Sequence, residues 1–393
     1  MEARFHRPAA LLIISLVALF LWFRSSPPFP NKTPLAHGSQ PAFSSGLNYT
    51  RLQPANSTLG VCTLPCLLDC HRIPLTFRQF GAVVAISRAN SPRQEHLLFA
   101  GNLTGIDITI PHQPKWSEDD ISKFKAEKDS RITRGSAMAW LGHLNALRWF
   151  LDSRHETVII LEDDVDWDIH LRTVQVPLVS ENFQRLTSSR DTYWGDLTKW
   201  EILYLGHCGD FFSVDDWEKL QHTTFPDDTL LPRSRMHTRT RELLESLDIY
   251  EGYRMLHRSK WPLCTFGYAV NRASARRILE ELAPKETEGG CQAYDVRILE
   301  GCRDLDYKCY SANPELFHHI QAPSEITNAN DGTDDAGRIE RTGVVTTTNI
   351  ACSARSDSFF TKDPATLKYL QQEIGEKGHC LVDLMEEDAK KPF

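Results

Sequence analysis

Apolar positions along the middle of the chain follow two repeating patterns. Short apolar or alternating runs predict strands at 81–86, 106–110, 158–161 and 202–206. Residues 136–153 predict a helix, because apolar side chains recur at helical spacing at Trp140, Leu144, Leu147 and Leu151. Further helices are predicted to begin at the capping residues Ser91 and Asn271, and near 367–374. Strands that alternate with helices predict an α/β fold with a mostly parallel sheet.

The strand predicted at 158–161 ends in a cluster of acids. Its four apolar residues are followed by Glu162, Asp163, Asp164 and, after Val165, by Asp166. In open α/β sheets, ligands collect beyond the carboxyl ends of the strands. Packed carboxylates repel one another, and a hard divalent cation relieves that repulsion. Such a cation keeps open positions that bind phosphate oxygens, so the cluster predicts a metal and phosphate site.

A solvated loop and a calcium loop are the two other interpretations of this cluster. An acidic turn after a strand is often a solvated loop, but the buried strand before it makes that less favourable. A calcium loop of the EF-hand type would use Asp164, Asp166 and Asp168. That loop needs glycine at its sixth position and glutamate at its twelfth, where this chain has Ile169 and Gln175.

The N-terminus predicts a membrane anchor. Residues 9–23 form an uncharged apolar run, with Arg4 and Arg7 before it and Arg24 after it. An A-x-A-like cleavage site is missing, which favours an uncleaved signal anchor over a cleaved signal peptide. Residues 1–24 are therefore predicted as a cytosolic tail and transmembrane helix. The basic flank places everything after it in the lumen, as in a single-pass type II protein of the endoplasmic reticulum or Golgi membrane.

Sequons and cysteines agree with a lumenal body. Four N-x-S/T sequons occur, at Asn31, Asn48, Asn56 and Asn102. The chain has ten cysteines, an even number that fits disulfides in an oxidising compartment, although the sequence leaves their connectivity open. Residues 25–79, rich in Pro, Ser and Asn, are predicted to be a stem.

Composition narrows the functional classes further. The 393 residues carry a formal net charge of −8, and 41% are hydrophobic and 24% charged. These values are ordinary for a folded soluble domain. The acidic balance gives no sign of nucleic-acid binding.

The order of motifs over residues 80–326 resembles glycosyltransferase family 25, the family of lipopolysaccharide and collagen galactosyltransferases. The block 158–165 is similar to the family's I-L-E-D-D-V signature. Later blocks resemble its remaining elements, namely Gly267-Tyr268-Ala269-Val270 with Ala275, Tyr294-Asp295, Pro314-Glu315-Leu316 and Ser324-Glu325-Ile326. Length and anchor look most like the fungal, membrane-anchored branch.

Two blocks depart from the family pattern. The opening I-N-L reads Ala85-Ile86-Ser87, so an asparagine expected near the nucleotide is absent, while Arg93 still fits. The G-C-x-x-S-H block reads Met138 to His143 and keeps only the histidine. These departures bear on contacts to the donor base more than on the metal site.

The resemblance implies a GT-A-like nucleotide-sugar-binding domain at 80–326, followed by a C-terminal extension at 327–393. The implied reaction moves a hexose, usually galactose from UDP-galactose, to a glycan or glycoprotein acceptor with inversion, and the implied cation is Mn²⁺. By analogy, Asp164 and, more weakly, Asp166 bind the metal, and the resemblance places Arg93, Glu162 and Asp163 at the donor.

An inverting transfer needs a general base for the acceptor hydroxyl. Asp295 is the candidate, with N-capping of a helix as its alternative role and Glu300 and Asp304 as substitutes. His143 is expected to be a core residue, although His318 and His319 could reach the metal or phosphates. Four arginines in the polar insertion at 222–261 form either a solvated loop or a diphosphate clamp: Arg233, Arg235, Arg239 and Arg241.

Two further functions compete with the glycosyltransferase. A catalytically silent glycan-binding relative would have lost the acids at 162–164, which are intact here. A glycoside hydrolase would need a second carboxylate about 5 to 10 Å from the first, a distance that sequence does not give.

Overall fold

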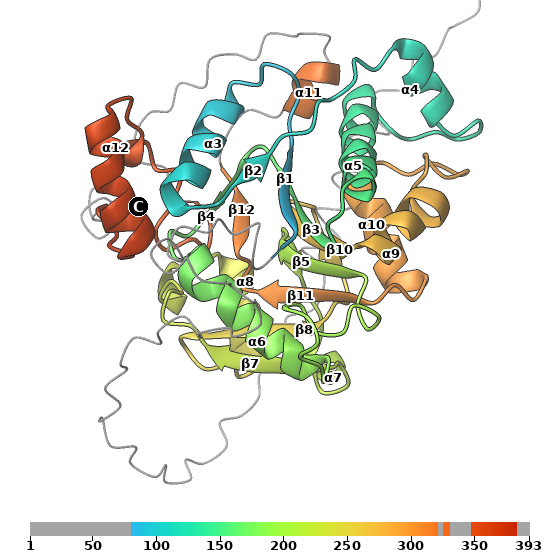
Figure 1. Cartoon of the computed structure of the whole chain (residues 1–393). Helices are drawn as coiled ribbons and strands as arrows, with labels where there is room; N and C mark the ends of the chain where they lie inside the picture. The colour runs from blue at the N-terminus through green and yellow to red at the C-terminus, as the bar shows by residue number, and fades with distance from the viewer. Residues whose placement is uncertain (1–79, 321–324, 331–346, 383–393) are drawn as a thin grey trace, which may run out of the picture. The chain divides into compact units, whose positions relative to one another are not determined.

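The computed structural model describes residues 80–320, 325–330 and 347–382 (Figure 1). The predicted anchor, the stem with its three sequons, and Cys62, Cys66 and Cys70 lie outside these residues. Within the described part of the chain, no helix is both long and apolar enough to cross a bilayer.

A central sheet organises the described residues. Its strand order is β2-β1-β3-β10-β5-β11-β8-β7, and β10 and β8 run opposite to the others. In that order the strands are Ile108–Thr109, Ala82–Ile86, Thr157–Glu162, Gly267–Asn271, Ile202–Gly206, Cys309–Asn313, Tyr253–Arg258 and His222–Pro226. β12 (Phe317–His319) adds to β5, and β4 (Val165–Trp167) pairs with β12. The predicted α/β fold with a mostly parallel sheet is confirmed.

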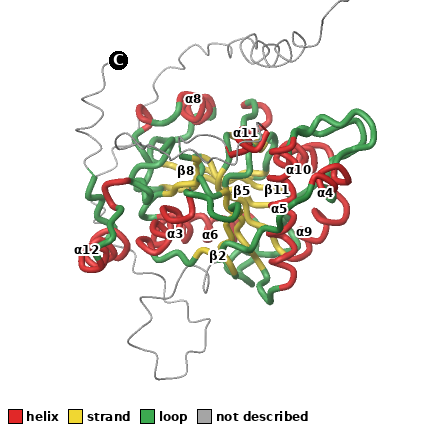
Figure 2. Tube along the Cα trace, turned by 90° about the horizontal axis from the view of Figure 1, so that it is seen from above, coloured by secondary structure: helices red, strands yellow, loops and turns green. Residues whose placement is uncertain are grey.

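Helices cover both faces of the sheet because its inner strands are apolar on both sides (Figures 1 and 2). On β3, Ile159 and Leu161 pack in a core with α3 (Arg93–Thr104) and α6 (Val176–Leu186). Val158 and Ile160 pack on the opposite face. The helices of that face are α5 (Arg134–Asp152), α9 (Arg272–Arg277) and α10 (Tyr294–Asp304).

Capping residues set where the helices begin. Asn271 accepts from the Ser274 amide and starts α9 with a capping box, as predicted. α3 begins at Arg93, so the predicted cap at Ser91 is two residues before the helix. Thr133 caps α5 through the amide of Ser136.

The polar insertion at 222–261, for which the sequence predicted no element, contains β7, β8 and α8 (Thr238–Ser246). β7 has a single buried residue, Phe225, so its sequence shows no apolar alternation. α8 buries Leu243 and Leu244 in a small core with Met255. Tertiary packing, rather than a local pattern, forms these elements.

The described C-terminal residues pack on the same sheet. The segment from 347 crosses β4, where Ser353 forms a bridge with Asp168. α12 (Pro364–Leu370) and η6 (Gln371–Glu376) follow, and η6 contacts α3. The helix predicted at 367–374 is confirmed and begins three residues earlier.

Short elements complete the chain and disulfides brace it. The short elements are α4 (Glu118–Phe124), η2 (Leu171–Gln175), β6 (Gly209–Asp210), α7 (Val214–Trp217), η3 (Arg233–Arg235), β9 (Pro262–Leu263), η4 (Ile278–Leu282), α11 (Glu325–Asn330) and η5 (Asp357–Phe359). Among the described cysteines, three disulfides form, Cys208–Cys264, Cys302–Cys309 and Cys352–Cys380, while Cys291 is buried and unpaired. Disulfide use is therefore confirmed.

Candidate functional site

The carboxyl ends of β1 and β3 lie side by side, with Ile86 opposite Glu162. The connections that follow these strands lead to opposite sides of the sheet, from β1 to β2 and from β3 toward β5. This reversal is where open α/β sheets bind their ligands. The turn 162–164 places the acid cluster at this position.

Arg93 joins two of the predicted acids. Its Nη1 lies 3.1 Å from Asp163 Oδ1 and 3.0 Å from Asp164 Oδ2. Asp163 also accepts a 2.5 Å hydrogen bond from the hydroxyl of Ser87. Arg93, Asp163 and Asp164, which the sequence placed at one site, are thus brought together, and Ser87 at the end of β1 joins them.

Asp164 is the least satisfied acid of the cluster. Its Oδ1 is buried and accepts no hydrogen bond from the described part of the chain. Burial raises the pKa of Asp164, although the nearby Arg93 guanidinium lowers it. His319 on β12 also acts on Asp164 electrostatically. In the pairing of β12 with β4, His319 lies opposite Val165, the residue that follows the acidic turn.

Glu162 points to a different set of partners. Its Oε1 accepts a 2.9 Å hydrogen bond from the Thr265 hydroxyl and lies 3.9 Å from His143 Nε2. Burial, followed by the charge of Asp164, raises the pKa of Glu162 from 4.5 to about 8. Without a ligand, Glu162 therefore holds a proton at neutral pH.

His143 is a buried member of an aromatic network. Its Nδ1 lies 3.1 Å from the Tyr268 hydroxyl, which lies 3.0 Å from the Tyr294 hydroxyl. The ring stacks on Tyr294 with centroids 4.2 Å apart. Burial lowers the pKa of His143 to about 3, so the ring is neutral. The predicted core position is confirmed, and the network links Glu162 to the start of α10.

Asp295 lies in the first turn of α10. The N-cap of the helix is Ala293, and Asp295 accepts from the amides of Val296, at 2.9 Å, and Cys264. Burial raises the pKa of Asp295 despite these bonds. Its charge also raises the pKa of Glu162, so the two carboxyls influence one another. The alternative role as N-cap does not apply.

The substitute acids on α10 are already paired. Glu300 bonds Arg297 at 2.9 Å, and Asp304 pairs with Arg303. Asp295 is thus the acid of this helix that electrostatically reaches the cluster on β3.

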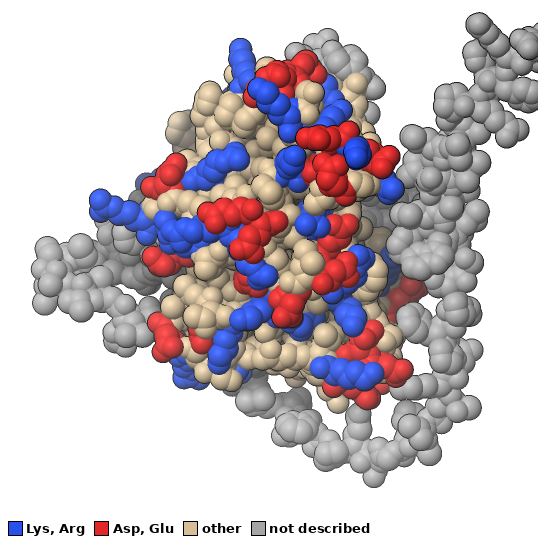
Figure 3. All heavy atoms as spheres, turned by 90° about the vertical axis from the view of Figure 1, so that its right-hand side faces the viewer, with Lys and Arg blue, Asp and Glu red and all other residues tan. Residues whose placement is uncertain are grey.

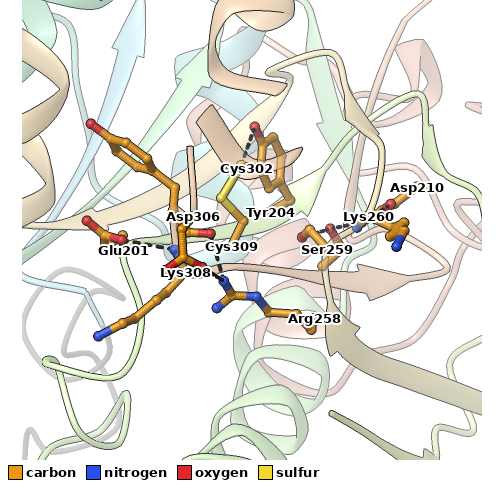
Figure 4. The surroundings of a disulfide bond; sticks show 12 residues. Glu201, Tyr204, Asp210, Arg258, Ser259, Lys260, Cys302, Asp306, Lys308 and Cys309 are labelled. Atoms are coloured by element: carbon orange, nitrogen blue, oxygen red, sulfur yellow. Dashed lines mark hydrogen bonds and ion pairs between the residues drawn. A yellow bond between two sulfur atoms is a disulfide. The ribbon is translucent and has the colours of Figure 1, made fainter. Parts of the chain in front are cut away.

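A disulfide braces the far end of α10. Cys302, in the last turn of the helix, is bonded to Cys309, the first residue of β11. Figure 4 shows the Tyr204 hydroxyl directed at this bond, 3.9 Å from Cys302 Sγ. The helix that carries Asp295 is therefore fixed to the sheet.

Asp166 differs from Asp164, although both were predicted to bind metal. Its oxygens accept from the hydroxyls of Thr347 and Ser353 and from the amides of Trp167 and Arg355. With these donors and complete burial, Asp166 holds the C-terminal segment against β4. Its metal role stays a prediction that this geometry does not favour.

Arg355 holds the backbone of the acidic turn. Its Nη1 donates to the backbone carbonyls of Asp163 at 2.8 Å and Val165 at 2.7 Å. The residue is buried and stands 190 positions after Val165 in sequence. No local signal identified it.

The remaining sequence candidates separate in space. His318 bonds Glu315 at 2.6 Å, whereas His319 stacks on Phe266 and acts on Asp164. Arg233 donates to the backbone carbonyls of Ile249 and Tyr250, which gives it a structural partner in the insertion.

The described residues do not by themselves form a complete metal site. In the described residues, no three or more His, Cys, Asp or Glu side chains form a group that could hold a metal. Two groups of the kinds that Mn²⁺ accepts are present: the buried, unbonded Asp164 Oδ1 and the imidazole of His319, which acts on Asp164 electrostatically. Phosphate oxygens and water would complete such a site.

Comparisons with known proteins add little. No protein-family profile and no curated protein matches the chain. Among solved structures, CMP:2-keto-3-deoxy-manno-octonic acid synthetase complexed with CTP aligns with 12% identity over 58% of this chain and 88% of its own, at a TM-score of 0.24. At that score the likeness carries no argument about function.

Proposed function

We propose that the chain is an inverting, metal-dependent glycosyltransferase similar to family 25. It transfers a hexose, most readily galactose from UDP-galactose, to a glycan or glycoprotein acceptor. The observation that carries the proposal is the buried, unbonded Asp164 Oδ1 beside the switch point of an α/β sheet. Burying such an atom without a partner costs free energy, which a bound cation offsets.

Donor binding follows from the cluster around Arg93. Asp164 and His319 would hold Mn²⁺, and the cation would supply positive charge to offset the charge on a leaving diphosphate. Arg93 orients Asp163 and Asp164, and its guanidinium adds positive charge beside the diphosphate. Asp163, held by Ser87, is available to orient the ribose or sugar.

Asp295 removes the acceptor proton. Its raised pKa, caused by burial, makes it a stronger base than a solvated aspartate. The amides of Val296 and Cys264 fix the orientation of the carboxylate.

A glycoside hydrolase is the second candidate, and one observation favours it. Glu162, with its pKa near 8, carries a proton and lies within electrostatic reach of Asp295. A protonated acid facing an ionised one is the arrangement that glycosidases use. The catalytically silent glycan-binding relative is less favoured, because all three acids of the turn are present.

A donor panel separates these functions. The purified residues 25–393 are incubated with nucleotide sugars, a mixed glycan acceptor, and either Mn²⁺ or chelator. Transfer from UDP-galactose that chelator stops and Mn²⁺ restores supports the proposal. Full transfer in excess chelator contradicts the metal-dependent mechanism, and cleavage of aryl glycosides without nucleotide identifies the hydrolase.

The setting of the reaction is the lumen of the secretory pathway, as proposed from the apolar run 9–23 and the sequons after it. In a eukaryotic host, the full chain should resist carbonate extraction and lose mass on treatment with an N-glycosidase. A secreted product that begins near Ser26 would show instead that the run is a cleaved signal.

A further inference from the structure

One short segment touches both carboxyls that flank the site. Between β9 and β10, the amide of Cys264 donates to Asp295, and the hydroxyl of the next residue, Thr265, donates to Glu162. These acids come from different elements, α10 and β3. The segment 264–265 is therefore a bridge that sets where the two carboxyls lie relative to one another.

This bridge has an unfavourable backbone that the surrounding structure must hold. Cys264 has φ 67°, in the left-handed region that residues with a Cβ rarely adopt. Its disulfide to Cys208 ties the segment to the residues after β5. The Cys208 amide also donates to the Leu263 carbonyl at 2.8 Å.

The residues just before this segment are anchored separately. β6 pairs with β9, and the Asp210 carboxylate accepts from the amides of Lys260 and Trp261. Figure 4 shows Asp210 beside Lys260. These contacts do not involve the disulfide, so we expect its opening to release residues 264–265 while residues 260–263 stay anchored.

We infer that the Cys208–Cys264 disulfide is a positioning element of the active site, holding Cys264 and Thr265 so that one aligns Asp295 and the other aligns Glu162. The inference rests on the proposed transferase function. Thr265 and the two cysteines act through the acids and do not touch the reacting atoms.

The disulfide is open to external thiols. Cys208 is exposed, whereas both cysteines of Cys302–Cys309 are buried. A thiolate of a dithiol reagent attacks Cys208 Sγ and releases Cys264 as a thiolate; the second reagent thiol then displaces Cys208 and closes the reagent's own disulfide. The protein gains two thiols and the reagent is oxidised. Mild reduction should therefore lower the transfer rate reversibly.

Thr265 gives the sharper test, because two variants differ by its hydroxyl alone. Thr265→Val keeps the shape and removes the donor to Glu162, while Thr265→Ser keeps the donor. We expect Thr265→Val to lower kcat about tenfold or more, and Thr265→Ser to stay within about threefold of wild type. UDP affinity with Mn²⁺ should change less than about threefold in both. Equal kcat in Thr265→Val and wild type would overturn the inference.

The disulfide is tested against a matched one. Cys208→Ser/Cys264→Ser should lower kcat about tenfold and make the enzyme insensitive to dithiol. Cys352→Ala/Cys380→Ala removes a disulfide that also has one exposed cysteine. This variant should keep the wild-type kcat and should still lose activity in dithiol. An equal loss in both variants would show that the disulfide merely stabilises the fold and would sink the inference.

Failure of the function and failure of the inference give different results. If wild type neither transfers hexose nor binds UDP with Mn²⁺, the proposed function fails. Hydrogen exchange then tests the bridge itself: in the double serine variant, amides 264–266 and 294–297 should exchange faster than in wild type. Unchanged exchange there contradicts the inference whatever the reaction is.

Discussion

Buried acids in two regions of the protein have opposite surroundings. Glu286, after η4, accepts five hydrogen bonds, from the Ser130 hydroxyl and the amides of Ala126, Arg131, Ile132 and Cys291. Burial alone raises its pKa, but these donors more than reverse the effect and bring it to about 2. At the end of β3, Glu162 has one hydroxyl donor and a pKa near 8, and Asp164 has a buried oxygen without a donor.

The number of donors decides what each acid does. A carboxylate with a full set of donors stabilises the fold as an anion, and Glu286 thereby ties the 126–132 loop to the residues after η4. A buried carboxylate with few donors costs free energy unless a ligand completes its contacts. By this measure Asp166 belongs with Glu286, although its sequence position groups it with Asp164.

Paired substitutions at Asp164 and Asp166 test whether the number of donors decides the role of each acid. Asp164→Asn should lower Mn²⁺-dependent transfer about 10³-fold or more, because a metal ligand contributes several kcal/mol to the transition state. Its free energy of unfolding should stay within about 1 kcal/mol, since no full donor set is lost. Asp166→Asn should instead cost about 3 kcal/mol of stability, because the amide turns a donor toward other donors. Activity and urea unfolding are measured on both variants, and the reverse ranking would contradict the comparison.

Asp295→Asn tests the third acid with few donors. The change is nearly isosteric and removes the base, so kcat should fall about 10²- to 10⁴-fold. UDP affinity with Mn²⁺, measured by calorimetry, should stay within about threefold, because Asp295 is proposed to act on the acceptor. A variant that melts at a lower temperature but has a normal kcat would show that Asp295 has a structural role and is not the base.

Local chemistry made part of this molecule predictable. The β3 run, the Asn271 cap and the helix α5 were found because their signals lie within a few residues of one another. The acids of the turn were found for the same reason. The sequence did not predict β7, because this strand has one buried residue and shows no apolar alternation.

The partners of the acids were not predictable from sequence. The donors that satisfy Asp166 come from positions 347–355, more than 180 residues away. Thr265 reaches Glu162 over a separation of 103 residues. Ser87, Thr265 and Arg355 carry no motif of their own, so only the folded chain shows which acids are satisfied and which are not.

Glu286→Gln measures the satisfied side of the comparison. The amide replaces one accepting oxygen by a donor, so at pH 7 the variant should be about 2 kcal/mol less stable. The folded pKa of about 2 lies below the ordinary value of 4.5, so this stability is fully present above about pH 5. It is lost as pH falls toward 2, where the unfolding curves of wild type and variant should converge. A difference that persists at pH 2 would mean that shape, not charge, holds the loop.

Glu162→Gln should show a pH dependence of stability with the opposite slope. The folded pKa of Glu162 lies near 8, above its ordinary value of 4.5, so between these values the unfolded chain has lost a proton that the folded chain retains. Wild-type stability therefore falls as pH rises through this window, whereas a glutamine that cannot ionise does not contribute to the fall. In metal-free buffer, the variant should match wild type near pH 4.5 and become progressively more stable than it up to pH 8. Gln can still accept from Thr265, so the bridge is kept. Parallel unfolding curves from pH 5 to 8 would show that Glu162 is ionised in the free protein and belongs with Glu286 after all.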